Sequence, residues 1–212
     1  MVSLIPPVRV SLAPLAVLLA AMLPTTVASG LLDGCLSTAT PIGFPAAIAV
    51  CPAGDGQTLA DVGARIDVVT RDPGGNEIQH IPGQDIWVIG CGQRDLCWRA
   101  AASNADEPTD INGKTTITGT IAAGGTHAGV NVYLQGIVVL SQPGCTGPLC
   151  LALEFRSVDI DGDLAVTLVD LVLLARSFPP NPYNTAADFN FDGVVGVFDL
   201  AFFAAHFQHA CP

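Results

Sequence analysis

Basic residues are scarce in this 212-residue chain. Eight lysines and arginines stand against nineteen aspartates and glutamates, which gives a formal net charge of −11, and Lys114 is the sole lysine. A surface with this excess of negative charge repels the phosphates of nucleic acids and of anionic membranes. We therefore expect no nucleic-acid partner and an affinity for cations instead.

The sequence also lacks the short motifs that carry common enzyme chemistry. It contains no nucleophile elbow, phosphate-binding loop, dinucleotide fingerprint or His-Glu metalloprotease helix. Glutamate occurs only at Glu77, Glu107 and Glu154, and nothing in the sequence pairs these residues as the two carboxylates of a glycosidase. We therefore expect a protein that is not an enzyme.

Apolar runs long enough to cross a bilayer are missing as well. The run from Ser11 to Leu23 is interrupted by Pro14, whereas a membrane-spanning helix needs about 20 apolar residues. Arg9 precedes this run and small residues around Ala28 follow it, as in a secretory signal. We predict a signal peptide over residues 1–29, no membrane span, and a secreted protein that is extracellular or at the cell surface. An N-terminal membrane anchor is the alternative.

Seven cysteines fit an oxidising compartment. Two pairs enclose short segments and are expected to form local disulfides, a third pair follows by elimination, and one cysteine is left over. None of the spacings matches a zinc knuckle. The expected pairs are Cys91–Cys97, Cys145–Cys150 and Cys35–Cys51, with Cys211 unpaired.

Short β-prone runs separated by turn residues fill the chain between residues 31 and 156. In the run Arg65–Thr70, Ile66 and Val68 alternate with Asp67, as in a strand that is buried on one face. Short strands without helical periodicity predict a mainly β fold, namely a β-sandwich. The other predicted strands are Ala47–Val50, Asp85–Ile89, Thr115–Ile121, Gly129–Gln135 and Leu151–Phe155.

Two turn-and-strand units in this region resemble bacterial immunoglobulin-like domains of the invasin and intimin type. The first is Ile66-Asp-Val-Val-Thr-Arg-Asp-Pro-Gly-Gly-Asn-Glu-Ile78, and the second is Thr109-Asp-Ile-Asn-Gly-Lys-Thr-Thr116. The resemblance implies an immunoglobulin-like β-sandwich domain over residues 31–156, which serves as a spacer or display domain at a cell surface.

Near the C-terminus, two twelve-residue segments carry oxygen-bearing side chains in the same register, 29 residues apart. In each, these side chains stand at the first, third, fifth and twelfth places, which is the ligand order of an EF-hand calcium loop. Solvated Asp-rich turns are the alternative, but the duplication of the whole unit favours calcium loops. The residues are Asp159, Asp161, Asp163 and Asp170 in loop 1 (residues 159–170), and Asp188, Asn190, Asp192 and Asp199 in loop 2 (residues 188–199).

A short helix is predicted after each loop, because apolar residues recur there at i, i+3 and i+7. These residues are Leu171, Leu174 and Phe178 after loop 1, and Leu200, Phe203 and Phe207 after loop 2. No helix is predicted before either loop, and prolines separate the two halves. Residues 158–212 therefore resemble a dockerin, the duplicated calcium-binding domain that attaches secreted proteins to cohesin modules.

The dockerin resemblance implies a Ca²⁺ ion in each loop, held by the side chains named above. It also implies that Thr167 contributes directly or through water, and that the backbone carbonyls of Ala165 and Val194 fill the seventh place of each loop. The sixth place requires a sharp turn that suits glycine. It is Gly193 in loop 2 but Leu164 in loop 1, where a side chain costs on the order of 1 kcal/mol.

The tenth and eleventh places often touch the cohesin partner in dockerins. Here they are Leu168 and Val169 in loop 1, and Val197 and Phe198 in loop 2. We expect these apolar side chains either to form a docking face for a cohesin-like or other extracellular protein, or to pack between the two helices.

The leading hypothesis is a secreted, non-catalytic calcium-binding protein whose dockerin-like module attaches an immunoglobulin-like display domain to an extracellular complex or the cell surface. The alternative is a carbohydrate-binding accessory of a cellulosome-like, polysaccharide-degrading complex, with Trp87 and Trp98 as a glycan platform. His206 and His209, followed by Cys211, suggest either a transition-metal site or cationic groups at a helix C-terminus.

Overall fold

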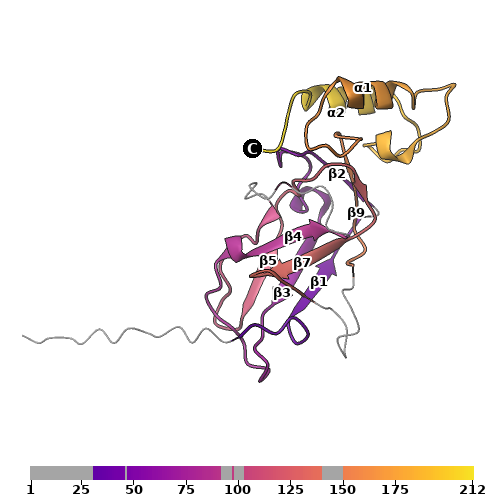
Figure 1. The fold of residues 1–212 in the computed structure, drawn as a ribbon. Helices are drawn as coiled ribbons and strands as arrows, with labels where there is room; N and C mark the ends of the chain where they lie inside the picture. The colour runs from indigo at the N-terminus through magenta and orange to yellow at the C-terminus, as the bar shows by residue number, and fades with distance from the viewer. Residues whose placement is uncertain (1–30, 46, 92–96, 98–102, 140–149) are drawn as a thin grey trace, which may run out of the picture.

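The computed structural model describes residues 31–45, 47–91, 97, 103–139 and 150–212. This part of the chain is mainly β, with three small sheets of three strands each and two α-helices (Figure 1). The predicted signal peptide, Trp98 and Cys145 lie outside the described residues. The strands are β1 (Thr38–Ile42), β2 (Ala47–Val50), β3 (Arg65–Val69), β4 (Ile86–Gly90), β5 (Lys114–Ile117), β6 (Thr126–His127), β7 (Val130–Leu134), β8 (Ile137–Val138) and β9 (Glu154–Ser157), and the helices are α1 (Leu168–Ala175) and α2 (Val197–Ala205).

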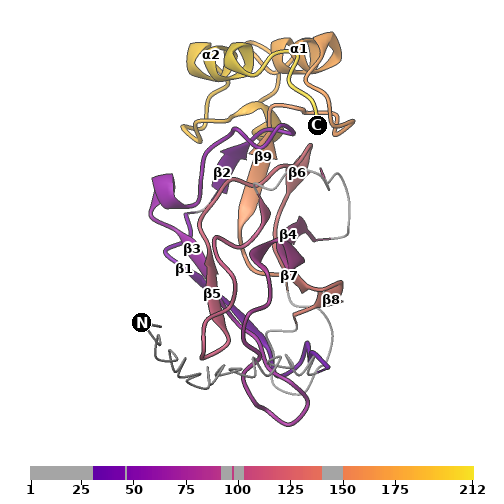
Figure 2. The same ribbon diagram turned by 90° about the vertical axis from the view of Figure 1, so that its left-hand side faces the viewer.

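The first sheet has the order β1–β3–β5 and is antiparallel throughout. In β3, Ile66 and Val68 are buried whereas Asp67 is half-buried, which is the alternation that the sequence predicts. The second sheet, β4–β7–β8, lies beside the first in Figure 2. Side chains of both sheets meet in one core, to which β9 adds Phe155.

In the sequence, Val130, Val132 and Leu134 alternate with Asn131 and Tyr133, which predicts a half-buried strand. Strand β7 is instead buried along its whole length. It lies between β4 and β8, so neither of its edges is free. Tyr133 pairs across the strands with Trp87, and the two rings stack with 5.9 Å between their centroids. This stacking helps to bury Tyr133, which the sequence alternation places on the solvent-exposed face of the strand.

The third sheet connects the β-rich region to the helices. Strand β2 runs parallel to β9, which also pairs with β6. Because successive side chains of a strand point to opposite faces, Ile48 and Val50 enter the core between the two larger sheets, while Ala49 and Cys51 enter a second core. The other buried members of the second core lie between Val158 and Phe203, in and around loops 1 and 2, so β2 contributes to both cores.

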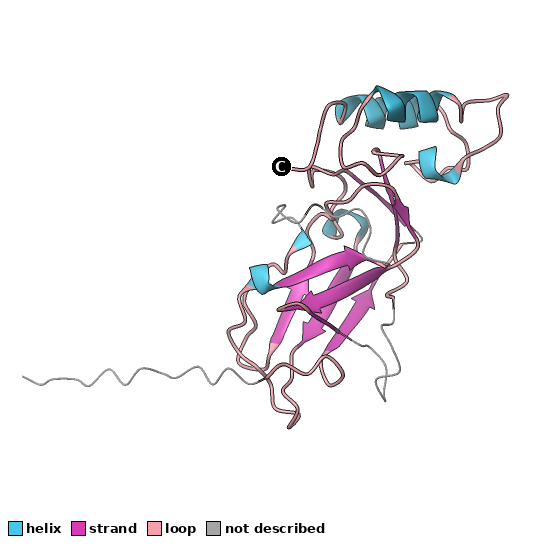
Figure 3. Cartoon of the chain, viewed as in Figure 1, coloured by secondary structure: helices cyan, strands magenta, loops and turns pink. Residues whose placement is uncertain are grey.

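Helices α1 and α2 form a layer at the end of the molecule beyond β2 and β9 (Figures 2 and 3). Leu174 of α1 and Phe203 of α2 are buried in the second core, as predicted. Phe178 and Phe207 pack there too but lie beyond the helix ends, and Leu200 is 40% exposed. The helices are therefore shorter than the apolar spacing suggests.

The disulfides overturn the local pairing expected from the sequence. Cys91 is bonded to Cys150, and Cys97 is bonded to Cys211, across 59 and 114 residues respectively. Cys35 is also disulfide-bonded. Cys51 is buried and is the free cysteine of the described residues, whereas Cys211 was expected to be unpaired. Sequence proximity misled here because strand pairing and the returning C-terminus bring distant cysteines together.

Candidate calcium site

The twelfth residue of each loop organises that loop and is also the third residue of the helix that starts inside the loop. In loop 1, Asp170 Oδ1 accepts hydrogen bonds from the N–H groups of Ile160 and Asp161, at 2.8 and 3.1 Å. Its Oδ2 accepts the N–H of Thr167 at 2.8 Å, and Thr167 is the N-cap of α1. The carboxylate therefore closes the loop and supplies a helix cap at the same time.

Loop 2 repeats these bonds at the equivalent positions. Asp199 Oδ1 accepts from the N–H groups of Phe189 and Asn190, at 2.7 and 3.3 Å. Its Oδ2 accepts from the N–H of Gly196, the N-cap of α2, at 2.7 Å. The sequence repeat is thus also a repeat of hydrogen bonding.

The first, third and fifth residues add three further bonds that recur in both loops. The first residue accepts the N–H of the sixth, the third accepts that of the fifth, and the fifth accepts that of the seventh. The bonds are Leu164 N–H to Asp159, Asp163 N–H to Asp161 and Ala165 N–H to Asp163 in loop 1, and Gly193 N–H to Asp188, Asp192 N–H to Asn190 and Val194 N–H to Asp192 in loop 2.

Both loops take a left-handed backbone conformation at their fourth and sixth places. In loop 1 these are Gly162 and Leu164, with φ of 77° and 71°, and in loop 2 they are Phe191 and Gly193, with φ of 60° and 84°. Each loop thus has glycine at one such place and a strained side chain at the other. Leu164 has the left-handed conformation required at the sixth place, in which a leucine side chain is strained.

Loop 1 brings three carboxylates together. Oxygens of Asp159, Asp161 and Asp170 lie within 4.8 Å of one another, whereas Asp163 is exposed and outside this group. Burial is the main cause that raises the pKa of Asp159 to about 7; the charge of Asp170 adds to the rise, and the bond from Leu164 N–H opposes it. A bound cation supplies the positive charge that such a group requires.

In loop 2, the buried first residue has an unsatisfied oxygen. Asp188 Oδ2 accepts from the Tyr183 hydroxyl at 2.6 Å and lies 3.6 Å from the Arg156 guanidinium. Asp188 Oδ1 has no hydrogen-bond partner and is shielded from solvent. Nothing in the spacing of the sequence indicates Tyr183 or Arg156 at this loop, because both lie outside the twelve-residue pattern.

The donor set of both loops fits Ca²⁺. Every side-chain donor is a carboxylate, amide or hydroxyl oxygen, which is the ligand type that a hard cation prefers. Asp159, Asp170, Asp188 and Asp199 are buried residues, each at most 1% exposed, and burying negative charge without a partner is costly. When bound, the ion supplies this positive charge and holds the loop closed at the start of its helix. Thr167, by contrast, donates its hydroxyl to Asp170 at 3.3 Å and caps α1.

The four side chains at the tenth and eleventh places do not pack between the helices. Leu168 and Val169 are 65% and 54% exposed, and Val197 and Phe198 are 69% and 70% exposed. This excludes the packing alternative and leaves the four side chains free for contact. A hollow of about 540 Å³, lined in part by Leu168, Val169 and Phe207, lies next to the loop 1 pair.

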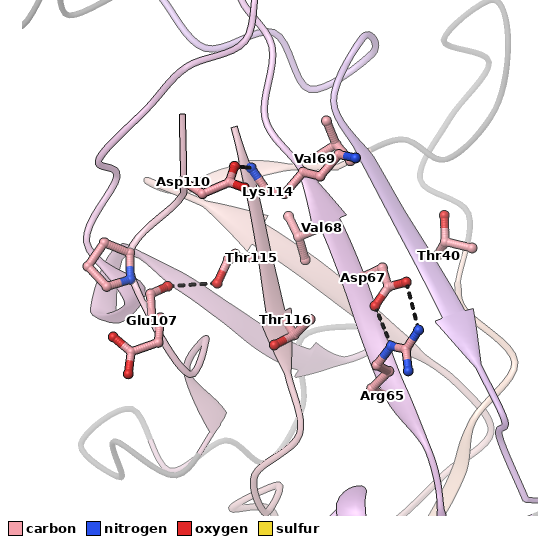
Figure 4. A pocket seen from close by; sticks show the side chains of 11 residues that line it. Thr40, Arg65, Asp67, Val68, Val69, Glu107, Asp110, Lys114, Thr115 and Thr116 are labelled. Carbon is pink, nitrogen blue, oxygen red and sulfur yellow. Dashed lines mark hydrogen bonds and ion pairs between the residues drawn. The ribbon is translucent and has the colours of Figure 1, made fainter. Parts of the chain in front are cut away.

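A broader depression, of about 780 Å³, lies on the first sheet (Figure 4). Its polar groups are largely paired with one another: Arg65 with Asp67 at 2.7 Å, and Asp110 with the Lys114 N–H at 2.8 Å. Trp87, which the glycan alternative invokes, is half-buried and stacks on Tyr133. The sequence-based alternative of a glycan platform thus gains no further support here.

Comparison with known proteins identifies no family. Neither a protein-family model nor a curated protein matches the chain. Among solved structures, the Lin-41 filamin domain is 16% identical over 57% of this chain and 95% of that chain, with a TM-score of 0.29. In the described residues, no helix is both long and apolar enough to cross a membrane.

Proposed function

We propose that this chain is a secreted, non-catalytic, calcium-dependent attachment protein. An immunoglobulin-like β-sandwich over residues 31–156 is carried by a dockerin-like module over residues 158–212, which binds one Ca²⁺ in each loop. The observation that carries the proposal is the set of hydrogen bonds that recurs position by position in the two loops. Two disulfides among the described residues support an oxidising, extracellular destination.

The docking surface of this proposal is the pair of apolar patches at the starts of the helices. Leu168 and Val169 begin α1, and Val197 and Phe198 begin α2. Each patch directly precedes the carboxylate that closes its loop, so calcium binding positions the patch. Because the halves repeat, a cohesin-like partner can bind through either patch, in two orientations.

The test is capture of a secreted partner from the native secretome by the full chain, with calcium and then with chelator. Replacing either apolar pair by serines should weaken capture, and replacing all four residues should abolish it. The melting temperature should stay nearly unchanged, because these side chains are exposed. Ile111→Ser, at an equally exposed apolar residue in the β-rich region, is the matched control and should bind normally.

Two results would contradict the proposal. Capture that persists in chelator would remove the role of calcium. A stably folded quadruple variant that still captures its partner would remove the role of the apolar patches and leave the β-rich region as the binding surface.

A further inference from the structure

A second group of metal-binding side chains lies where the C-terminus returns to the β-rich region. Cys51 directly follows β2, Asp55 lies in the turn after it, and His209 follows α2. His209 Nδ1 lies 2.8 Å from Asp55 Oδ2 and 4.0 Å from Cys51 Sγ. One potential ligand atom from each of the three residues lies within 4.8 Å of the others. None of these residues belongs to either calcium loop.

The geometry does not match a cysteine nucleophile with its base. In such a relay, one imidazole nitrogen faces the sulfur while the other is held by the carboxylate. Here the same atom, His209 Nδ1, faces both Cys51 and Asp55. Convergence of sulfur, nitrogen and oxygen on one point is instead a metal-site arrangement.

We propose that Cys51, Asp55 and His209 bind a borderline-soft transition ion, Zn²⁺ in the first instance. In a tetrahedral zinc site with bond lengths of about 2.0–2.3 Å, ligand atoms lie about 3.4–3.6 Å apart. The two separations from His209 Nδ1, 2.8 and 4.0 Å, bracket this range, and the Cys51 and Asp55 ligand atoms lie within 4.8 Å of each other. Calcium is disfavoured because it takes oxygen ligands.

The surroundings define the remaining coordination position. The ring centroid of His206 lies 5.6 Å from that of His209. Its Nε2 lies 3.3 Å from the Asp55 carbonyl and its Nδ1 lies 2.8 Å from the Phe202 carbonyl, so both ring nitrogens already face backbone oxygens. His206 therefore orients the turn that contains Asp55 and is not one of the proposed metal ligands. Asp55 and His209 are partly exposed, at 45% and 38%, so the fourth position is open to water.

Metal at this position ties two regions of the chain together. Cys51 is part of the second core through β2, and the His209 carbonyl accepts the N–H of Val166, which lies in loop 1, at 2.8 Å. A bound ion therefore restrains the C-terminal tail against both the β-rich region and the end of loop 1. This role is separate from calcium binding and does not depend on the docking proposal.

The test is a Co²⁺ titration of the untagged, oxidised full chain in excess calcium. Oxygen ligands of the calcium loops give no sulfur-to-metal band, so a thiolate-to-cobalt charge-transfer absorption reports on Cys51 alone. We expect this band to saturate at one equivalent and to disappear on addition of Zn²⁺. Cys51→Ser should abolish it, and His209→Asn should weaken Co²⁺ affinity at least about tenfold. His80→Asn, at an exposed histidine in the β-rich region, is the matched control and should leave the band intact.

If a variant fails to fold, a measurement on the unmodified chain still tests the proposal. X-ray absorption at the zinc edge should show one sulfur neighbour at about 2.3 Å. A zinc shell of oxygen and nitrogen alone, or a cobalt band that survives Cys51→Ser, would overturn the proposal.

Discussion

At the scale of single residues, loops 1 and 2 distribute backbone strain differently. Loop 1 has leucine at its sixth place and glycine at its fourth, and loop 2 has phenylalanine at its fourth and glycine at its sixth, although all four have positive φ. Phe191 is compensated, because its ring lies under the Arg156 guanidinium at 4.8 Å. Leu164 is half-buried, and its aliphatic side chain has no aromatic ring or charge with which to make such a contact.

Leu164→Gly should therefore raise the free energy of unfolding of the calcium-saturated protein by about 0.5–1 kcal/mol, because glycine adopts positive φ without strain. Urea denaturation in excess calcium measures this. Phe191→Gly is the matched comparison and should destabilise the protein, since it removes the contact with Arg156. A loss of stability in Leu164→Gly would show that packing of the leucine side chain outweighs its strain.

At the scale of elements, each helix depends on the carboxylate that closes its loop. Helix α1 has eight residues and α2 has nine, and isolated helices shorter than about 12–15 residues are marginal in water. Their stability comes from packing in the second core and from the caps at Thr167 and Gly196. In the proposed calcium-bound state, the ion in each loop holds the cap in place.

Removing calcium should therefore unfold α1 and α2 while the β-rich region stays folded. Far-ultraviolet circular dichroism of the full chain should lose its helical signal in chelator and regain it with calcium. The near-ultraviolet signal should persist, because the stacked Trp87 and Tyr133 lie in the second sheet. An unchanged helical signal and melting temperature in chelator would refute this coupling.

Much at this scale could be predicted from the sequence. β2 occupies its predicted span, and β3 and β4 lie within one residue of theirs. A helix accompanies each loop as the apolar spacing indicates, but it starts at the tenth residue of the loop rather than after it. Strand β1 escaped prediction because it is an exposed edge strand that contains Pro41 and buries only Ala39. Strands β6 and β8 have two residues each and leave no periodic signal.

The candidate metal sites could also be predicted from the sequence only in part. The loop residues follow a fixed local spacing, so sequence alone could name them. The Cys51, Asp55 and His209 group could not be found this way, because its members are brought together by the tertiary fold across more than 150 residues. Two signals were available in the sequence, the odd number of cysteines and the pair His206 and His209. Both pointed to Cys211 as the cysteine involved, but Cys211 is bonded to Cys97.

At the scale of the whole molecule, the Cys97–Cys211 disulfide joins the C-terminal tail to the β-rich region. It closes a loop of 114 residues, for which the loop-entropy estimate is about 4–5 kcal/mol. Converting both cysteines to serine should lower the free energy of unfolding by up to that amount. Peptide mapping without reduction should recover Cys97 and Cys211 in one linked fragment. Recovery of a Cys91–Cys97 fragment would contradict the pairing.

The same disulfide has a mechanical consequence for a protein that is held through its helices. Tension applied at the start of α1 reaches the β-rich region through loop 1 and Val158. Tension applied at the start of α2 can be transmitted to the β-rich region through the C-terminal tail and the disulfide between Cys211 and Cys97. The two halves therefore have separate covalent anchors and can share a pulling force in parallel. A partner that binds either half is therefore linked covalently to the β-rich region without the other half having to bear the force.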